Sequence, residues 1–309
     1  MDKIAVIEAG VIGRVWAIVF ARAGFQVSIH ETPPADSAEA LRVIRARLKE
    51  LASYGQLGDS EDAVFARISL APSLEAALDG AVYAQESGTD TLEAKVDWFT
   101  RLDRIAAPTT ILASSTSTVF PSHFTASVPG RERCIVVHPV QPPYALRAVE
   151  VVPSQWTSAD TVARSRALVE RWGLVPIMVR REVPGYAINS LQVALMFEAL
   201  RLVAQGVVSA EDCEAVVKHG LGPRWSFMGP FETAGVNGAG GLAEFFQRQA
   251  AFYSQVQATQ TPPPLTPELI AQIHEATWPM LQGNESGARR EWRDRRLMAL
   301  AQHKAGQPE

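Results

Sequence analysis

The 309-residue sequence has few cysteines and no strong charge of either sign. Its two cysteines, Cys134 and Cys213, follow no metal-binding or redox spacing, so we expect no metal site and interpret both as inert core residues in a reducing cytosol. The net charge of −4 gives no reason to expect nucleic acid or an anionic membrane as a partner. These absences favour small-molecule chemistry.

Long apolar runs are also missing. No window reaches the roughly 18 apolar residues of a membrane span, and the N-terminus continues directly into strand-like sequence without a secretory signal. We therefore expect a cytoplasmic protein without a membrane segment. The 47% share of hydrophobic residues suffices for a large core, and the length fits two domains.

The first half of the chain alternates strand-like and helix-like segments. A strand-like run over residues 3–9 precedes a helical pattern over residues 12–23, which Gly24 ends, and a second strand-like run follows at residues 25–31. Further apolar, strand-like runs lie at residues 80–85, 109–115, 133–139, 148–153 and 174–179. This alternation predicts an α/β fold with a doubly wound, mostly parallel sheet of the Rossmann type.

The pattern changes after Pro184 and Gly185, two residues that interrupt regular structure. Apolar residues then recur at helical spacing, for example over residues 188–203 and 269–281, which predicts an all-helical second domain. Thr266 followed by Pro267 predicts an N-cap and a first helical residue. We expect one domain over residues 1–184 and a helical domain over residues 185–309.

The stretch VIEAGVIGRVWA, which begins at Val6, nearly forms the Gly-x-Gly-x-x-Gly loop that binds dinucleotides between a strand and a helix. Gly10 would let the backbone approach a pyrophosphate, and Gly13 would let the helix pack against the strand. We expect Val11 and Ile12, between the two glycines, to contact the cofactor as well.

An acidic residue follows at the usual distance. Glu31 lies 18 residues after Gly13, at the end of the second strand, where a carboxylate accepts hydrogen bonds from the adenosine ribose hydroxyls. Its charge would repel a 2′-phosphate, so the pattern favours NAD over NADP. The alternative is a helix-strand turn without a ligand and an ordinary exposed acid.

Glu8 stands where the loop should have its first glycine. Its side chain would occupy a turn that is usually free of one, and a carboxylate about 5 Å from a pyrophosphate would cost on the order of 3 kcal/mol at an effective dielectric near 20. That corresponds to roughly a hundredfold in affinity. Arg14, one residue after Gly13, would offset part of this by pairing with Glu8 or with the phosphate.

Over nearly its whole length the chain resembles the 3-hydroxyacyl-CoA dehydrogenase family, in its lambda-crystallin or L-gulonate 3-dehydrogenase branch. The matching stretches are residues 10–27, 114–122, 134–144, 149–153, 182–192, 220–233 and 289–301. The resemblance implies an NAD-binding domain, a helical substrate and dimerisation domain, a homodimer, and NAD-linked oxidation of a 3-hydroxy acid.

The resemblance also implies roles for particular residues. His138 would be the catalytic base, Glu150 would orient it, and Ser117 and Asn189 would contact the reacting oxygen. Further implied contacts, to the nicotinamide ribose, involve Lys95 and Asp90, the latter in place of the family's glutamate.

These roles are chemically coherent. Oxidation of a secondary alcohol needs a group that accepts the hydroxyl proton while a hydride leaves carbon, and histidine titrates in the useful range. His138 ends the apolar run CIVVH, and open α/β sheets bind ligands at the carboxyl ends of their strands. A carboxylate such as Glu150, twelve residues later, fixes the histidine tautomer and favours the imidazolium. Each residue alone also has an ordinary structural explanation, but the set occurs in the family's order.

Arg224 is a candidate for binding the substrate. Members of this branch act on free acids, and an arginine fork suits a carboxylate. Arg224 lies in GLGPRWSF, between glycines and aromatic residues, and a solvent-exposed arginine is the alternative. In the C-terminal stretch the arginines alternate with Glu291 and Asp294, which indicates a mixed-charge amphipathic helix at a dimer contact and argues against a nucleic-acid patch.

The sequence therefore predicts an NAD-dependent oxidoreductase that oxidises the 3-hydroxyl of a small hydroxy acid similar to L-gulonate or 3-hydroxybutyrate. One alternative is a protein of the same fold in which Glu8 impairs NAD binding, and which acts as a non-redox enzyme or as a structural or ligand-binding protein. A further alternative is a 3-hydroxyacyl-CoA dehydrogenase.

Overall fold

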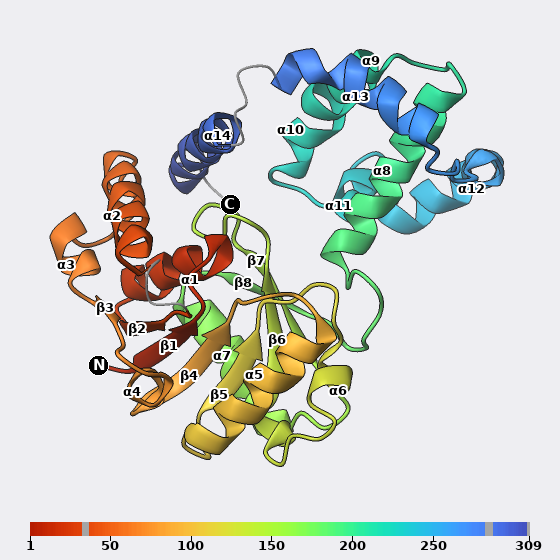
Figure 1. Cartoon of the computed structure of the whole chain (residues 1–309). Helices are drawn as coiled ribbons and strands as arrows, with labels where there is room; N and C mark the ends of the chain where they lie inside the picture. Colours follow the sequence, from red (N-terminus) through yellow and green to blue (C-terminus); the bar gives the residue numbers. More distant parts are fainter. Residues whose placement is uncertain (33–36, 282–286, 308–309) are drawn as a thin grey trace. The chain divides into compact units, whose positions relative to one another are not determined.

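The computed structural model describes the chain except for residues 33–36, 282–286 and 308–309 (Figure 1). The chain forms two compact units. The first unit contains residues 1–189 together with residues 290–309, and the second contains residues 190–289.

An eight-stranded sheet forms the centre of the first unit, with the order β3-β2-β1-β4-β5-β6-β7-β8 (Figure 1). The strands are β1 (Lys3–Ile7), β2 (Gln26–His30), β3 (Ile68–Leu70), β4 (Ala81–Glu86), β5 (Ile111–Ser114), β6 (Cys134–Pro139), β7 (Ala148–Pro153) and β8 (Val175–Met178). All neighbouring strands are parallel except β6 and β7. The predicted Rossmann-type sheet is confirmed, and only the three-residue β3 was not expected.

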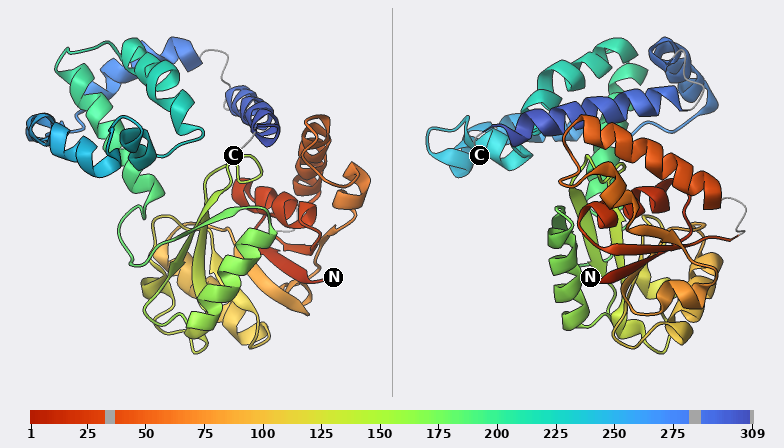
Figure 2. Two further views of the ribbon diagram at one scale, coloured as in Figure 1. Left: turned by 180° about the vertical axis from the view of Figure 1, so that it is seen from behind. Right: turned by 90° about the vertical axis from the view of Figure 1, so that its left-hand side faces the viewer.

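Helices cover both faces of this sheet (Figures 1 and 2). The alternation along β1 sets the two faces, because Ile4 and Val6 belong to one buried cluster and Ala5 and Ile7 to the other. The first cluster includes residues of α1 (Val11–Arg22), α2 (Ser37–Ser53), α3 (Glu61–Phe65) and α7 (Ala159–Arg171). The second includes residues of α4 (Leu74–Leu78), α5 (Leu92–Ile105) and α6 (Pro121–Phe124). A 3-10 turn, Arg131–Arg133, precedes β6.

The last helix, α14 (Ala288–Ala305), packs onto the first unit beside α2 (Figure 2). Met298 is fully buried there, the Tyr144 hydroxyl donates a 2.6 Å hydrogen bond to Asp294, and Arg295 forms a 2.6 Å ion pair with Glu50. This division differs from the expected single domain over residues 185–309. The cause is the buried face of α14, whose apolar and paired residues have their partners in the first unit.

The second unit is helical, and its described residues 190–281 and 287–289 form no strand. Its elements are most of α8 (Ile188–Ala204), α9 (Ala210–Ala215), a π-helix (Val216–Leu221), α10 (Gly222–Trp225), α11 (Pro230–Gly235), α12 (Gly241–Thr259) and α13 (Pro267–Leu281). The predicted cap of α13 is confirmed, since the Leu269 N–H donates to the Thr266 hydroxyl over 3.2 Å.

Apolar side chains are exposed along α8, among them Leu191 at 69% and Met196 at 54%. An exposed apolar face of this kind is typical of a protein interface. It is compatible with the expected homodimer, which stays a prediction. Cys134 is buried, as expected, but Cys213 is only half-buried, so its assignment to the core was wrong. None of the described helices combines the length and the apolar character that crossing a bilayer requires.

Candidate active site

The loop between β1 and α1 leaves the first backbone N–H groups of the helix without a side-chain cap. Gly10 is the N-cap residue, and the first turn, which contains Val11 and Ile12, has no acidic residue. A Cβ on Gly13 would lie 2.0 Å from the Glu8 carbonyl oxygen, whereas a Cβ on Gly10 would meet no atom within 4 Å. Free N–H groups at a helix N-terminus bind phosphate, and the open space at Gly10 permits its approach. The loop therefore fits a dinucleotide pyrophosphate.

Glu8 adopts a left-handed backbone conformation, with φ of 67°. Its Oε1 atom is buried without a hydrogen bond from the described residues, and its side chain lies against the loop after β4, where a Cβ on Gly88 would be 3.1 Å from Glu8 Cγ. Burial, and next the charge of Glu31, raise the pKa of Glu8 despite hydrogen bonds with Thr32. Glu8 is thus a carboxylate in an unfavourable place.

Arg14 does not pair with Glu8. The Arg14 Nε atom donates a 2.6 Å hydrogen bond to the Ala9 carbonyl oxygen, and no ion pair joins Arg14 to Glu8 among the described residues. Of the two expected roles of Arg14, pairing with Glu8 is not seen, because the loop backbone offers Arg14 a nearer acceptor, and pairing with the phosphate stays a prediction.

Glu31 follows β2 directly and is half-buried. Ile7 and His30 are paired in the register of β1 and β2, so the residues that follow them, Glu8 and Glu31, are neighbours at the carboxyl ends of these strands. This is the position that the ribose contact requires, and the contact itself stays a prediction.

His138 and Glu150 are directly opposite each other in the antiparallel pair β6 and β7. The Nδ1 atom of His138 lies 2.8 Å from Oε2 of Glu150, whose side chain is fully buried. A carboxylate in this position accepts a hydrogen bond from Nδ1–H, and the tautomer inferred from that contact leaves Nε2 as the acceptor. The imidazole is therefore set up to take a proton at Nε2.

The second oxygen of Glu150 is also fixed. Oε1 accepts hydrogen bonds of 2.7 and 2.9 Å from the backbone N–H groups of Ala187 and Ile188. Burial by itself raises the pKa of Glu150, but the hydrogen bonds from His138, Ile188 and Ala187 outweigh it and hold the pKa below its usual value. Asn189, half-buried, is the next residue of α8, so the same contacts anchor its backbone near Glu150.

The turn before α8 supplies a residue that the sequence did not reveal. Gly185 and Tyr186 both have positive φ, of 74° and 47°. The buried Tyr186 ring lies 6.0 Å from the His138 ring, centroid to centroid, and so packs beside the imidazole. The Pro-Gly pair indicated a turn, but no pattern indicated which aromatic ring the turn would bury.

A buried ion pair lies at the end of β4. Lys95 Nζ contacts both carboxylate oxygens of Glu86, at 2.8 and 2.9 Å, and lies 3.7 Å from Asp90. Glu86 was not among the expected site residues. The sequence feature that could have indicated it is an acidic residue at the end of an apolar, strand-like run, nine residues before Lys95. Ser117, half-buried after β5, makes no side-chain hydrogen bond to another described residue.

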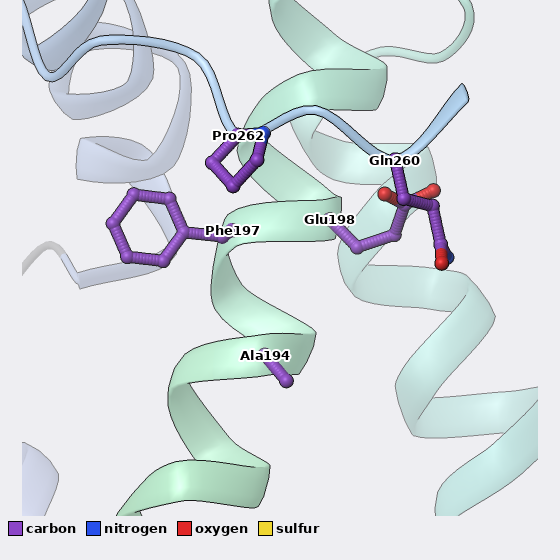
Figure 3. Close-up of a pocket in the computed structure, with 5 residues that line it drawn as sticks. All are labelled: Ala194, Phe197, Glu198, Gln260 and Pro262. Atoms are coloured by element: carbon purple, nitrogen blue, oxygen red, sulfur yellow. The ribbon is translucent and has the colours of Figure 1, made fainter. Parts of the chain in front are cut away.

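Arg224 is exposed on α10 of the second unit and forms no ion pair with a described residue. A shallow hollow of the same unit lies elsewhere, between α8 and residues 260–262 (Figure 3). It is lined by Ala194, Phe197, Glu198, Gln260 and Pro262. It contains none of the expected site residues, and Glu198 is already paired with Arg201. Throughout the described ranges, no three His, Cys, Asp or Glu side chains gather as a metal site would require.

Comparison with known proteins identifies both parts of the chain. Residues 3–183 match the sequence profile of the 3-hydroxyacyl-CoA dehydrogenase NAD binding domain, and residues 185–275 match that of its C-terminal domain. A lambda-crystallin homolog of Bos taurus is 39% identical over 313 residues, which cover 99% of this chain and 97% of the relative. An L-carnitine dehydrogenase of Pseudomonas aeruginosa is 36% identical over 299 residues, with coverage of 96% and 92%.

A solved structure extends this similarity to the whole fold. The crystal structure of 5-formyl-3-hydroxy-2-methylpyridine 4-carboxylic acid 5-dehydrogenase, an NAD+ dependent dismutase, has a TM-score of 0.84 to this chain. The two sequences are 25% identical, and the match covers 100% of both chains.

Proposed function

Because this chain belongs to the 3-hydroxyacyl-CoA dehydrogenase family, with NAD as its cofactor, we propose that it oxidises the 3-hydroxyl group of a small hydroxy acid. The observation that carries this proposal is the pair formed by His138 and the buried Glu150, 2.8 Å apart at the carboxyl end of β6.

Bound NAD supplies the hydride acceptor. In this proposal Nε2 of His138 accepts the proton of the substrate hydroxyl, while Nδ1 keeps its own proton and donates it in the hydrogen bond to Glu150. The imidazolium that results is stabilised by the Glu150 carboxylate, which two further hydrogen bonds, from backbone N–H groups, hold in place. Ser117 and Asn189 are proposed to donate hydrogen bonds to the reacting oxygen.

For the cofactor we assign Gly10, Val11, Ile12 and Gly13 to the pyrophosphate and Glu31 to the adenosine ribose. The uncapped start of α1 and the open space at Gly10 support the first assignment. The place of Glu31 after β2 supports the second. Asp90 and Lys95 are assigned to the nicotinamide ribose.

We propose a free acid as substrate, similar to L-gulonate or 3-hydroxybutyrate. The relatives named L-carnitine dehydrogenase favour this class, since L-carnitine is itself a free 3-hydroxy acid. Arg224 is the proposed partner of the carboxylate, because its guanidinium has no competing ion pair among the described residues. A 3-hydroxyacyl-CoA thioester is the rival substrate. The homodimer and the cytoplasmic location stay predictions.

A second candidate function follows from Glu8. If the half-buried Glu8 carboxylate at the loop prevents NAD binding, the same fold would serve as a non-redox enzyme or in a structural or ligand-binding role. The saturated contacts of Glu150 favour the dehydrogenase, because a purely structural protein has no need for a fixed imidazole.

The experiment is NADH formation from NAD with L-gulonate, L-3-hydroxybutyrate, L-carnitine and 3-hydroxybutyryl-CoA. Turnover of a free acid is expected, and His138→Asn should reduce it by about two to four orders of magnitude. His303→Asn, at an exposed position of α14, is the control and should leave the rate unchanged. Turnover that survives His138→Asn would dismiss the proposed base, and turnover of the thioester alone would select the rival substrate.

A further inference from the structure

Glu86 is a buried anion with all its hydrogen-bonding capacity in use. Oε1 accepts from Lys95 and, over 2.6 Å, from the Gly88 N–H, while Oε2 accepts from Lys95 and, over 2.6 Å, from the Ser114 hydroxyl. Glu86 and Lys95 are exposed by 0% and 1%. A buried ion pair is tolerated only when such additional bonds compensate its desolvation, so each partner of Glu86 is held firmly.

From Ser114 the contacts continue into the loop that carries Ser117. The Ser114 oxygen accepts a 3.2 Å hydrogen bond from the Thr116 N–H. The Thr116 hydroxyl oxygen, itself buried, accepts from the N–H groups of Thr118 and Val119, at 3.3 and 3.1 Å. These bonds close a tight turn around Ser117.

The loop then returns to the starting ion pair. The Thr118 hydroxyl donates a 2.7 Å hydrogen bond to Oδ2 of Asp90, and Oδ1 of Asp90 lies 3.7 Å from Lys95 Nζ. We call this closed circuit the carboxylate ring. It consists of Glu86, Ser114, Thr116, Thr118, Asp90 and Lys95.

Ser117 lies in the backbone segment that links two members of the carboxylate ring, Thr116 and Thr118. The hydroxyls of both threonines form hydrogen bonds, whereas the Ser117 hydroxyl forms none with the described residues. The opposite side of the ring contains Asp90 and Lys95. We propose that Thr118 is a positioning residue, which fixes the Ser117 hydroxyl relative to the cofactor contacts Asp90 and Lys95 through the carboxylate ring. This inference rests on the proposed function for the roles of Ser117, Asp90 and Lys95.

The circuit has a consequence for binding. A shift of Asp90 and Lys95 on cofactor binding passes to Ser117 through one exposed, charge-assisted hydrogen bond and one buried path through Glu86. The placement of Ser117 needs both contacts, because it lies between them. Removal of either contact should therefore release the same loop, and removal of the second should add little to the first.

The test compares Thr118→Val, Thr118→Ser, Ser114→Ala and the double variant Ser114→Ala/Thr118→Val. The matched control is Thr110→Val, which removes another threonine hydrogen bond, to the Ala81 carbonyl, at the opposite end of β5. Three quantities are measured for each protein: the Kd for NADH by fluorescence titration, and kcat and KM for the hydroxy acid.

Thr118→Val should lower kcat/KM by about tenfold and weaken NADH by about threefold, and Thr118→Ser should restore both because it keeps the hydroxyl. The double variant should lose about ten- to thirtyfold, well below the roughly hundredfold product of two independent tenfold losses. Thr110→Val should lose stability without changing either kinetic constant.

Equal behaviour of Thr118→Val and Thr110→Val would overturn the inference, and so would losses that multiply in the double variant. If the unmodified protein oxidises no hydroxy acid, the proposed function fails, and the NADH affinities decide alone. If Thr118→Val binds NADH more weakly and Thr118→Ser restores the affinity, the carboxylate ring is still supported. If Thr118→Val leaves the NADH affinity unchanged, the ring is rejected. Thr118 is exposed, so its variants test the inference even if Ser114→Ala does not fold.

Discussion

Replacement of Glu8 by glycine should make this chain a better NAD-binding protein. The substitution restores the residue type that the left-handed φ of 67° favours and removes a carboxylate whose Oε1 is buried without a hydrogen bond among the described residues. Gly13 is unchanged in this variant, and Ala9 can still accept the hydrogen bond from Arg14. The packing of α1 on β1 is therefore preserved.

The magnitude follows from charge and distance. A full negative charge about 5 Å from a pyrophosphate costs on the order of 3 kcal/mol at an effective dielectric near 20. Hydrogen bonds with Thr32 and partial exposure to water reduce this repulsion, so we expect a gain in NADH affinity of roughly ten- to a hundredfold. Relief of the backbone strain, about 1 kcal/mol, acts on the free and bound protein alike and should appear as stability.

The assay is a fluorescence titration with NADH at several salt concentrations and pH values. Glu8→Gln is the matched variant, because it removes the charge but keeps the side chain and its φ. If repulsion dominates, Glu8→Gln should give most of the gain, and the gain should shrink as salt rises.

The pH dependence has a definite sign. Since burial and Glu31 raise the pKa of Glu8, the neutral form persists above the usual glutamate range, and NADH should bind the unmodified protein more tightly as the pH falls through that pKa. Glu8→Gly should lose this dependence. An unchanged Kd in both variants would refute the reasoning, and a salt-independent gain seen only with glycine would assign the effect to steric exclusion.

Three further predictions concern the remaining site residues. Glu150→Gln should slow turnover and move the acidic limb of the kcat/KM profile to lower pH, because an amide does not stabilise an imidazolium. The lowered pKa of Glu150 also contributes stability that is lost as the pH falls through that pKa, so the melting temperature of Glu150→Gln should depend less on pH in this range. Arg224→Met should raise KM for a hydroxy acid much more than for its methyl ester, and Arg248→Met, on exposed α12, is the control; equal effects on acid and ester would remove Arg224 from the site. Glu31→Ala should weaken NAD and narrow its advantage over NADP, an expectation that fails if the unmodified protein already prefers NADP.

The sheet could be predicted because its signals are local. Apolar runs bounded by glycine and proline mark strands, and the three residues of β3 are too few to carry such a pattern. Local signals also placed His138 and Glu150 in strands, but their roles came from the family resemblance, and the register that brings them face to face is a finding of the structure.

The features that the sequence did not predict depend on packing between distant segments. Whether α14 joins one unit or the other is decided by single contacts such as Tyr144 with Asp294, 150 residues apart, and periodicity carries no such information. Tyr186 and Glu86 are similar cases, since their positions follow from a turn with positive φ and from a buried ion pair.

Glu8 and the catalytic pair lie at the ends of different strands of the sheet, and the distance between these strands determines where the Glu8 charge acts. Strands β4 and β5 lie between β1 and β6, so about three strand spacings, roughly 14 Å, separate the end of β1 from that of β6. At that distance two charges interact by about 1.2 kcal/mol at the same effective dielectric near 20. Physiological salt, with a Debye length of about 8 Å, screens most of this interaction. Glu8 therefore affects how tightly NAD is held and leaves proton transfer at His138 nearly untouched. Glu8→Gly should accordingly lower KM for NAD while kcat at saturating cofactor stays within about twofold, and a larger change in kcat would show that the loop and the catalytic pair are coupled through the protein.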